Sequence, residues 1–121
     1  MPEKLPVLSQ ETILARLPTE LPGWKLEDGW LRRKFSTDGW PTTLMLVNAI
    51  GFLSEAAWHH PDLEVTWGKI WVKLKTHASG GITERDFALA HEIEKLALWR
   101  PAAGSFMEGT PNKWVQAKQE S

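Results

Sequence analysis

Cysteine and tyrosine are both missing from this sequence of 121 residues, and neither sign of charge is in excess. The lack of cysteine excludes a disulfide framework and a thiolate metal site, and it fits a protein of the reducing cytoplasm. The 14 Lys and Arg residues against 15 Asp and Glu give a net charge of -1. This balance makes no electrostatic case for a nucleic acid or a membrane surface as partner, so we expect a small neutral or mildly polar ligand.

Long apolar segments are missing too. Residues 1–10 contain no apolar secretory core, and the longest apolar run, residues 44–53, is interrupted by Asn48 and is too short to span a bilayer. The sequence has no internal repeat, phosphate-binding glycine loop, nucleophile elbow or dinucleotide fingerprint. We expect a soluble cytoplasmic protein with a single domain over residues 1–98 and a C-terminal extension over residues 99–121.

Local signals predict a helix and a strand pair at the start of the chain. Ser9 is suited to cap a short helix, which Pro18 should end. From Trp24 the apolar residues recur with a period of two, which is typical of a half-buried strand. Asp28-Gly29 is a strong signal for a two-residue hairpin turn into a second strand over residues 30–36.

The rest of the domain repeats this order. Pro41 suits the first turn of a helix that runs to about Trp58, two alternating strands follow over residues 63–67 and 70–75, and a last helix covers residues 83–98. The order helix, strand, strand, helix, strand, strand, helix predicts an α+β fold. We expect three helices layered on one face of a four-stranded sheet.

Three of the four histidines lie close together in the sequence. His59 and His60 are adjacent and precede Pro61, which disfavours helical geometry in the residue before it, so we expect an exposed, non-helical corner with two imidazoles. His77 follows the second of the alternating strands and shares the parity of that strand's lysines, which places it on the solvent face. Imidazole titrates closest to neutral pH, so this grouping indicates acid and base catalysis.

The spacing of these residues resembles that of the pterin-4a-carbinolamine dehydratases. The family pattern has a charged residue, three residues, His-His-Pro, an aromatic, a His ten residues later and then an Asp. The run THASGGITERDFALA also resembles the family's passage from strand to helix, and a weaker likeness reaches back to Leu21. Two positions depart from the pattern, because some members carry an acidic residue in place of Trp58 or Ala78. The matching residues are Glu55, His59, His60, Pro61, Trp67, His77 and Asp86.

This resemblance implies an activity. A lyase would dehydrate 4a-hydroxytetrahydrobiopterin to quinonoid dihydropterin and water, in tetrahydrobiopterin recycling, without cofactor or metal. His59 and His77 would form the acid and base pair, in an order that the sequence leaves open, and His60 would chiefly hold the pterin. The resemblance also implies an antiparallel sheet and a homodimer or homotetramer. The substrate-binding residues that it implies are Glu55, His59, His60, Pro61, Thr76, His77, Ala78, Ser79 and Asp86.

Each of these residues has a plainer explanation as well. Three imidazoles plus water are a known zinc site, although adjacent histidines chelate poorly, and we expect no metal. Asp86 can be a helix-capping carboxylate alone, since Thr83 to Asp86 resembles a capping box. Glu55 can orient an imidazole or be a solvated surface acid. The alternative for the whole protein is a dehydratase-like binding or assembly protein without catalysis.

Two further predictions concern apolar surface. The helix over residues 41–58 is apolar on more than one face, which predicts self-association. In the extension, the prolines and glycines argue against a regular helix. Its apolar residues predict a segment packed on its own domain at anchor points, with fraying from Ala117 onward. These anchors are Trp99, Phe106, Met107 and Trp114.

Overall fold

The computed structural model describes residues 4–110 and 115–116. The strands form one antiparallel sheet in the order β1-β2-β4-β3. This architecture confirms the predicted α+β fold and its element order. The elements are α1 (Gln10–Glu20), β1 (Lys25–Glu27), β2 (Trp30–Ser36), α2 (Trp40–Ala57), β3 (Asp62–Thr66), β4 (Lys69–Leu74) and α3 (Glu84–Ala97).

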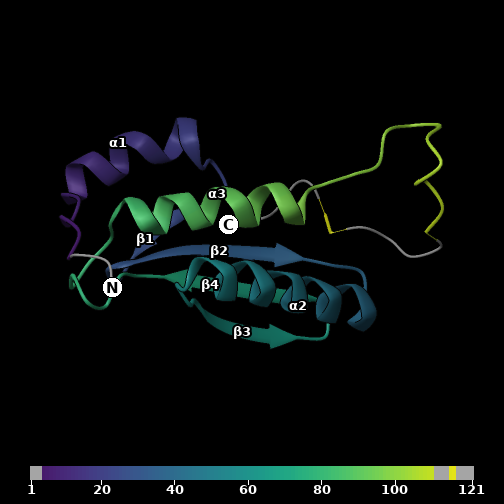
Figure 1. Ribbon diagram of the computed structural model, residues 1–121, viewed down its shortest axis with the longest axis horizontal. Helices are drawn as coiled ribbons and strands as arrows, with labels where there is room; N and C mark the ends of the chain where they lie inside the picture. Colours follow the sequence, from purple (N-terminus) through teal and green to yellow (C-terminus); the bar gives the residue numbers. More distant parts are fainter. Residues whose placement is uncertain (1–3, 111–114, 117–121) are drawn as a thin grey trace.

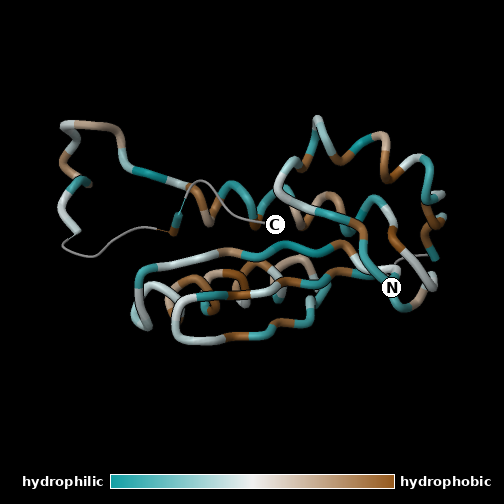
Figure 2. The backbone as a smooth tube through the Cα atoms, turned by 180° about the vertical axis from the view of Figure 1, so that it is seen from behind, coloured by the Kyte–Doolittle hydropathy of each residue, from teal (hydrophilic) through white to brown (hydrophobic). Residues whose placement is uncertain are grey.

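The helices cover one face of the sheet. In Figure 1, α2 and α3 lie in front of the strands, and Figure 2 shows the strands from the other side with α2 behind them. Alternate residues of β2 and β4 are buried beneath the helices, while their neighbours face the open side of the sheet. The buried strand residues include Leu31, Phe35, Ile70, Val72 and Leu74, which pack with Ile13, Leu17, Leu46, Ile50, Phe87 and Ile93 of the helices.

Local sequence signals explain most of the first helix and the first hairpin. Asp28 and Gly29 have φ values of 52° and 81°, as a two-residue turn with two left-handed positions requires. Ser9 caps α1, as predicted, because its hydroxyl accepts a hydrogen bond from the Thr12 amide. The prediction that Pro18 ends this helix was wrong. Pro18 lies in the last turn, where its missing N–H removes a single hydrogen bond, and the helix continues to Glu20.

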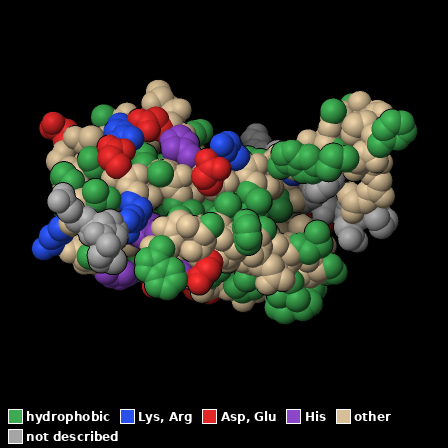
Figure 3. Space-filling model, in the orientation of Figure 1, with side chains coloured by type: hydrophobic (Ala, Val, Ile, Leu, Met, Phe, Trp, Pro, Cys, Tyr) green, Lys and Arg blue, Asp and Glu red, His purple; other side chains and the backbone are tan. Residues whose placement is uncertain are grey.

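Helix α2 carries apolar side chains that this chain leaves uncovered. Pro41 lies in its first turn, as predicted. Figure 3 shows hydrophobic side chains along this helix at the molecular surface. Self-association through this helix stays a prediction. The exposed apolar residues of α2 are Trp40, Leu44, Met45 and Phe52.

The C-terminal extension leaves α3 and runs away from the sheet (Figure 1). It is attached again near its end, because the Arg100 guanidinium donates to the Val115 carbonyl and the Gln116 amide donates to the Ser36 carbonyl at 3.0 Å. Val115 is buried with the core. Burial away from water lowers the pKa of Arg100. Residues 115–116 of the extension are therefore fixed to the domain.

The predicted anchors of the extension differ in exposure. Trp99 is half exposed, Met107 is exposed and Phe106 is fully exposed. Trp114 and the stretch from Ala117 onward lie outside the described residues. The attachment that the structure describes is therefore made by Val115, a residue that the sequence did not single out.

Candidate active site

The chain segments that carry the three histidines meet at one end of the sheet. In the antiparallel pairing of β3 with β4, Asp62 lies opposite Lys73, so the start of β3 and the end of β4 are adjacent. His59 and His60 directly precede β3, and His77 follows β4. A backbone bridge between Thr76 and Gly81 then leads the chain to the first turn of α3. The fold therefore brings the segments that carry the three histidines to the same end of the sheet.

Helix α2 ends in a left-handed residue, Trp58, directly before the two adjacent histidines. Trp58 has a φ of 51°, which is rare for a bulky side chain and implies local strain. Its amide donates to the Glu55 carbonyl, and the His59 amide donates to the Ser54 carbonyl. The turn puts His59 inside, with 7% of its surface exposed, and leaves His60 in solvent. The prediction that both imidazoles are exposed was therefore wrong for His59.

Inside the protein, His59 is held by the carboxylate of Asp86. The distance from His59 Nε2 to Asp86 Oδ1 is 2.6 Å, and Asp86 is 0% exposed. The other carboxylate oxygen accepts hydrogen bonds from Thr76 Oγ1 at 2.7 Å and from the Thr83 amide at 2.9 Å. A carboxylate with these donors is an acceptor, so His59 Nε2 carries the proton. In a neutral imidazole the lone pair then lies on the second nitrogen, Nδ1, which makes no hydrogen bond within the described ranges.

Asp86 also has the structural role that the sequence predicts. Thr83 is the N-cap of α3, and its hydroxyl accepts a hydrogen bond from the Arg85 amide. The side chain of Asp86 accepts from the Thr83 amide in return, which completes a capping box. The capping explanation of Asp86 is therefore confirmed, and its other oxygen contacts His59, while a direct contact of Asp86 with substrate stays a prediction.

The exposed histidine of the pair is held from α2. His60 Nε2 lies 2.9 Å from Glu55 Oε1, and the His60 ring makes an edge-on contact with Trp58 at 5.0 Å between centroids. Glu55 therefore orients an imidazole, as one of its two sequence explanations proposed. Both members of this pair are well exposed, so the ion pair contributes little to stability.

His77 has a neighbour that the sequence analysis missed. The exposed His77 ring contacts the Trp30 ring edge-on, with 5.5 Å between centroids. Leu31 pairs with Leu74 across β2 and β4, so Trp30 lies beside Lys75 on the open side of the sheet. The ammonium of Lys73 lies 4.4 Å from the Trp30 ring centroid, and that of Lys75 lies 5.4 Å from it. Only the strand register, which depends on tertiary structure, could have revealed this contact.

The loop after Thr76 holds the remaining predicted contacts. The amides of Ser79 and Gly80 donate to the Thr76 carbonyl and close a tight turn, and Ala78 is exposed on it. Ser79 Oγ is buried and has no hydrogen-bond partner in the part of the chain that the structure describes. A buried hydroxyl without a partner is unfavourable, so this oxygen calls for an explanation. Next to this loop is a hollow of about 360 Å³, whose lining includes Lys75, Gly80 and Gly81.

Comparison with known proteins assigns the family. The sequence model of the family described as pterin 4 alpha carbinolamine dehydratase matches residues 6–96. The chain belongs to this family. A protein of Aquifex aeolicus that is provisionally named a pterin-4-alpha-carbinolamine dehydratase is 51% identical over 89 residues, covering 74% of this chain and 89% of the relative. A relative of the same provisional name from Chloroflexus aurantiacus is 38% identical over 92 residues, covering 76% and 98%.

Solved structures of similar fold support the architecture of this dehydratase-family chain. A transcriptional coactivator/pterin dehydratase from Brucella melitensis superimposes with a TM-score of 0.71 at 23% identity, over 76% of this chain and 99% of the other. A pterin dehydratase-like protein described as a RuBisCO assembly factor of the alpha-carboxysome gives a TM-score of 0.53 at 20% identity, over 64% and 89%. At these identities the likeness shows the fold alone.

One residue of the dehydratase motif lies far from the rest. Trp67 follows the distal end of β3, about 16 Å along the strand from its start. Its carbonyl accepts a hydrogen bond from Thr43 Oγ1 on α2, and its side chain is exposed. Trp67 therefore belongs to the turn between β3 and β4, and not to the end of the sheet where the three histidines lie. The other motif residues meet at this edge, where Pro61 is half buried directly before β3.

Within residues 4–110 and 115–116, no group of three His, Cys, Asp or Glu side chains is arranged to hold a metal ion. Among those same residues, no helix combines the length and the apolar character that crossing a membrane requires.

Proposed function

We propose that this protein dehydrates a pterin-4a-carbinolamine, such as 4a-hydroxytetrahydrobiopterin, to quinonoid dihydropterin and water, and that it does so in the cytoplasm. The observation that carries the proposal is the buried Asp86 carboxylate, which binds His59 through one oxygen and Thr76, the neighbour of His77, through the other. A single buried side chain thus links the segment that carries His59 to the residue that directly precedes His77. Membership of the dehydratase family supports this choice of reaction.

The reaction needs one proton donated and one removed. The bond from the ring carbon to the hydroxyl breaks as the hydroxyl takes a proton and leaves as water, and the adjacent ring nitrogen loses its proton. We assign the removal to His59, because Asp86 holds the proton on Nε2 and leaves the Nδ1 lone pair as base. His77 then serves as the acid, and its exposure allows it to regain a proton from solvent.

The remaining polar groups are proposed to hold the pterin ring. His60, oriented by Glu55, lies at the exposed side of the site, and the unpartnered hydroxyl of Ser79 lies in the loop after His77. The backbone around Pro61 and Ala78 completes the contacts that the family resemblance implies. Neither chemical step requires a metal or an organic cofactor, and we propose that none is used.

We also propose that the protein works as a homo-oligomer. Four large apolar side chains of α2 are exposed on the isolated chain, which is the kind of surface that another subunit covers. The proposed chemistry itself uses residues from one chain.

The test is a dehydration assay with chelated protein, in which formation of quinonoid dihydropterin is followed for the wild type, His59→Ala and His77→Ala. Loss of a general acid or base should lower turnover by about 10²–10⁴-fold. His91→Ala is the matched control, because His91 lies on α3 with its Nε2 3.7 Å from Glu20 and should leave turnover unchanged.

Three other outcomes would change the proposal. If the wild type gave no rate above the spontaneous reaction, the enzyme assignment would fail, and a non-catalytic binding or assembly role would take its place. Activity lost on chelation and restored by zinc would contradict the metal-free mechanism. Equal losses in all three histidine variants would point to a structural effect.

A further inference from the structure

The open side of the sheet is basic, although the chain as a whole is not. Six cations and three carboxylates have the parity of the open side along the four strands and the residue after β4. The chain as a whole has a net charge of -1. The balance near zero therefore hides a local excess of positive charge. The cations are Lys25, Arg32, Lys34, Lys69, Lys73 and Lys75, and the carboxylates are Glu27, Asp62 and Glu64.

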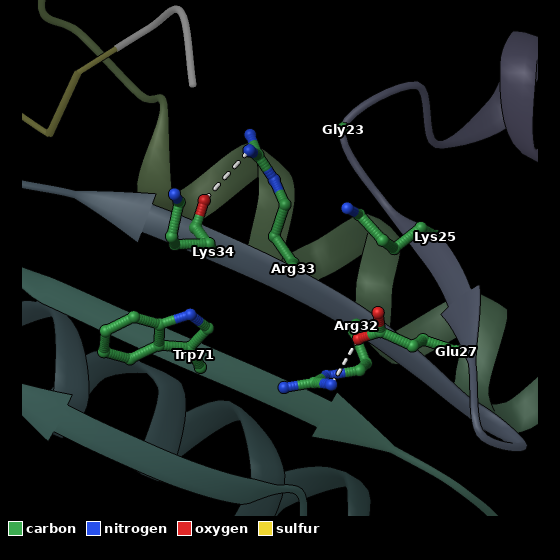
Figure 4. A pocket seen from close by; sticks show the side chains of 7 residues that line it. All are labelled: Gly23, Lys25, Glu27, Arg32, Arg33, Lys34 and Trp71. Carbon is green, nitrogen blue, oxygen red and sulfur yellow. Dashed lines mark hydrogen bonds and ion pairs between the residues drawn. The ribbon is translucent and has the colours of Figure 1, made fainter. Parts of the chain in front are cut away.

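The part of this face that is remote from the histidines has dispersed charges. A hollow of about 160 Å³ lies beside β1. Figure 4 shows its lining, with Lys25 and Lys34 on either side of Arg33. Arg32 is paired with Glu27, and Arg33 is paired with Glu94 of α3. In Figure 4 the side chains of Lys25 and Lys34 lie apart, with that of Arg33 between them.

Beside His77 the arrangement is different. Lys73 and Lys75 both place their ammonium groups against Trp30, and neither forms an ion pair in the part of the chain that the structure describes. Asp62 lies opposite Lys73 in the strand register without a salt bridge. Both lysines are half buried, so their side chains are held before any ligand arrives. Cation–π contact with an indole reduces the freedom that binding would otherwise remove.

We infer that the substrate pterin carries an anionic group, a phosphate or a carboxylate, on its side chain, and that Lys73 and Lys75 bind this group. The inference rests on the proposed function. Trp30 contacts both the lysines and His77, so the ammonium groups lie one aromatic ring away from the proposed acid. The dehydration step needs no cation one aromatic ring away from the acid. A negatively charged side chain on the pterin ring would need one. Lys75 also lines the hollow next to the loop that follows His77.

The test compares two ligands that differ by one phosphate group, 6-hydroxymethylpterin and its phosphate monoester, by calorimetry on the wild-type protein. Two partly exposed ion pairs should make the phosphate ester bind about tenfold more tightly. This preference should shrink in Lys73→Gln and Lys75→Gln, vanish in the double variant, and weaken as salt is raised. Pterin-6-carboxylate is the third ligand. Its affinity and that of the phosphate ester are each compared with that of 6-hydroxymethylpterin, and the larger gain identifies the anion.

The matched control is Lys69→Gln, which removes one charge from the same strand and the same face. Lys69 lies about 13 Å along β4 from Lys73, beyond the screening length of about 8 Å at physiological salt, so the preference should persist. Equal affinity of the wild type for the charged and neutral ligands would overturn the inference. So would a preference that survives in the double variant.

The outcomes also separate this inference from the proposed function. If a neutral pterin-4a-carbinolamine is dehydrated but the charged ligands gain nothing, only the anionic side chain is refuted. If no pterin binds and none is turned over, the proposed function fails and the inference fails with it.

Discussion

The substitution Asp86→Asn tests whether a buried carboxylate fixes the protonation of His59. Asn has the size of Asp, but it offers one oxygen and one NH₂ group. If the oxygen keeps the hydrogen bonds from Thr76 and Thr83, the NH₂ group faces His59 Nε2 at the position where Oδ1 now lies at 2.6 Å. Two donors cannot share a hydrogen bond, so the His59 proton should move to Nδ1.

This tautomer change removes the lone pair that we assign as the base. Turnover should therefore fall by about 10²–10⁴-fold, while KM should change little because His60 and Ser79 are untouched. Stability should fall as well, since three charge-assisted hydrogen bonds become neutral at a cost of about 1 kcal/mol each. Removal of a buried charge offsets part of that cost, so about 3 kcal/mol is an upper value.

The assay combines steady-state kinetics with imidazole nitrogen NMR, which distinguishes the two tautomers of His59 directly. Thr83→Ala is the control variant. It deletes the N-cap hydroxyl of α3, at about 1 kcal/mol, but leaves the bond between Asp86 and His59 in place. The control should therefore be less stable and still active.

Two results would refute the reasoning. A folded Asp86→Asn protein with wild-type turnover would show that the carboxylate does not set the base. Equal loss of activity in Thr83→Ala would mean that Asp86 acts only through the helix terminus.

Three further predictions concern the rest of the molecule. Arg16 holds the pKa of Glu20 below its usual value, so their pair stabilises the fold above the pKa of Glu20 in the unfolded chain, and this contribution is lost as pH falls through the lower folded pKa. Thermal melts of Arg16→Gln should lack this acid-sensitive part; an unchanged pH profile would contradict it. Light scattering at micromolar concentration should give an oligomer for the wild type and a smaller species for Phe52→Glu, whereas a monomeric wild type would count against an interface on α2. Truncation after Leu98 uncovers the site of Val115, so it should cost about 2 kcal/mol and lower the melting temperature, with measurable dehydratase activity retained; loss of all turnover in a folded variant would place the extension in the active site.

Local chemistry explains the parts of the fold that the sequence predicts well. The turn at Asp28-Gly29, proline in the first turn of α2 and the capping box of α3 each depend on residues a few positions apart. Strand alternation likewise depends only on neighbouring residues, so it assigns the two faces of β2 and β4 from sequence. These signals together determine the element order.

The features that the sequence did not reveal depend on contacts between distant segments. His59 is buried because Trp58 adopts a left-handed conformation, for which the sequence at the end of α2 gives no signal. The contact of His77 with Trp30 depends on the register of β2 against β4. For the same reason, the overall charge of the chain did not disclose the ammonium pair on the open side of the sheet.

Asp86 joins the assembly of the site to the folding of the domain. Its three donors come from three separate segments, since His59 follows α2, Thr76 follows β4 and Thr83 precedes α3. A fully buried carboxylate is costly unless it is paired, so its burial is favourable only when all three segments are in place. Local opening at any one of them would leave the charge with too few partners. The protonation state of His59 is therefore protected by the same cooperativity that keeps the domain folded.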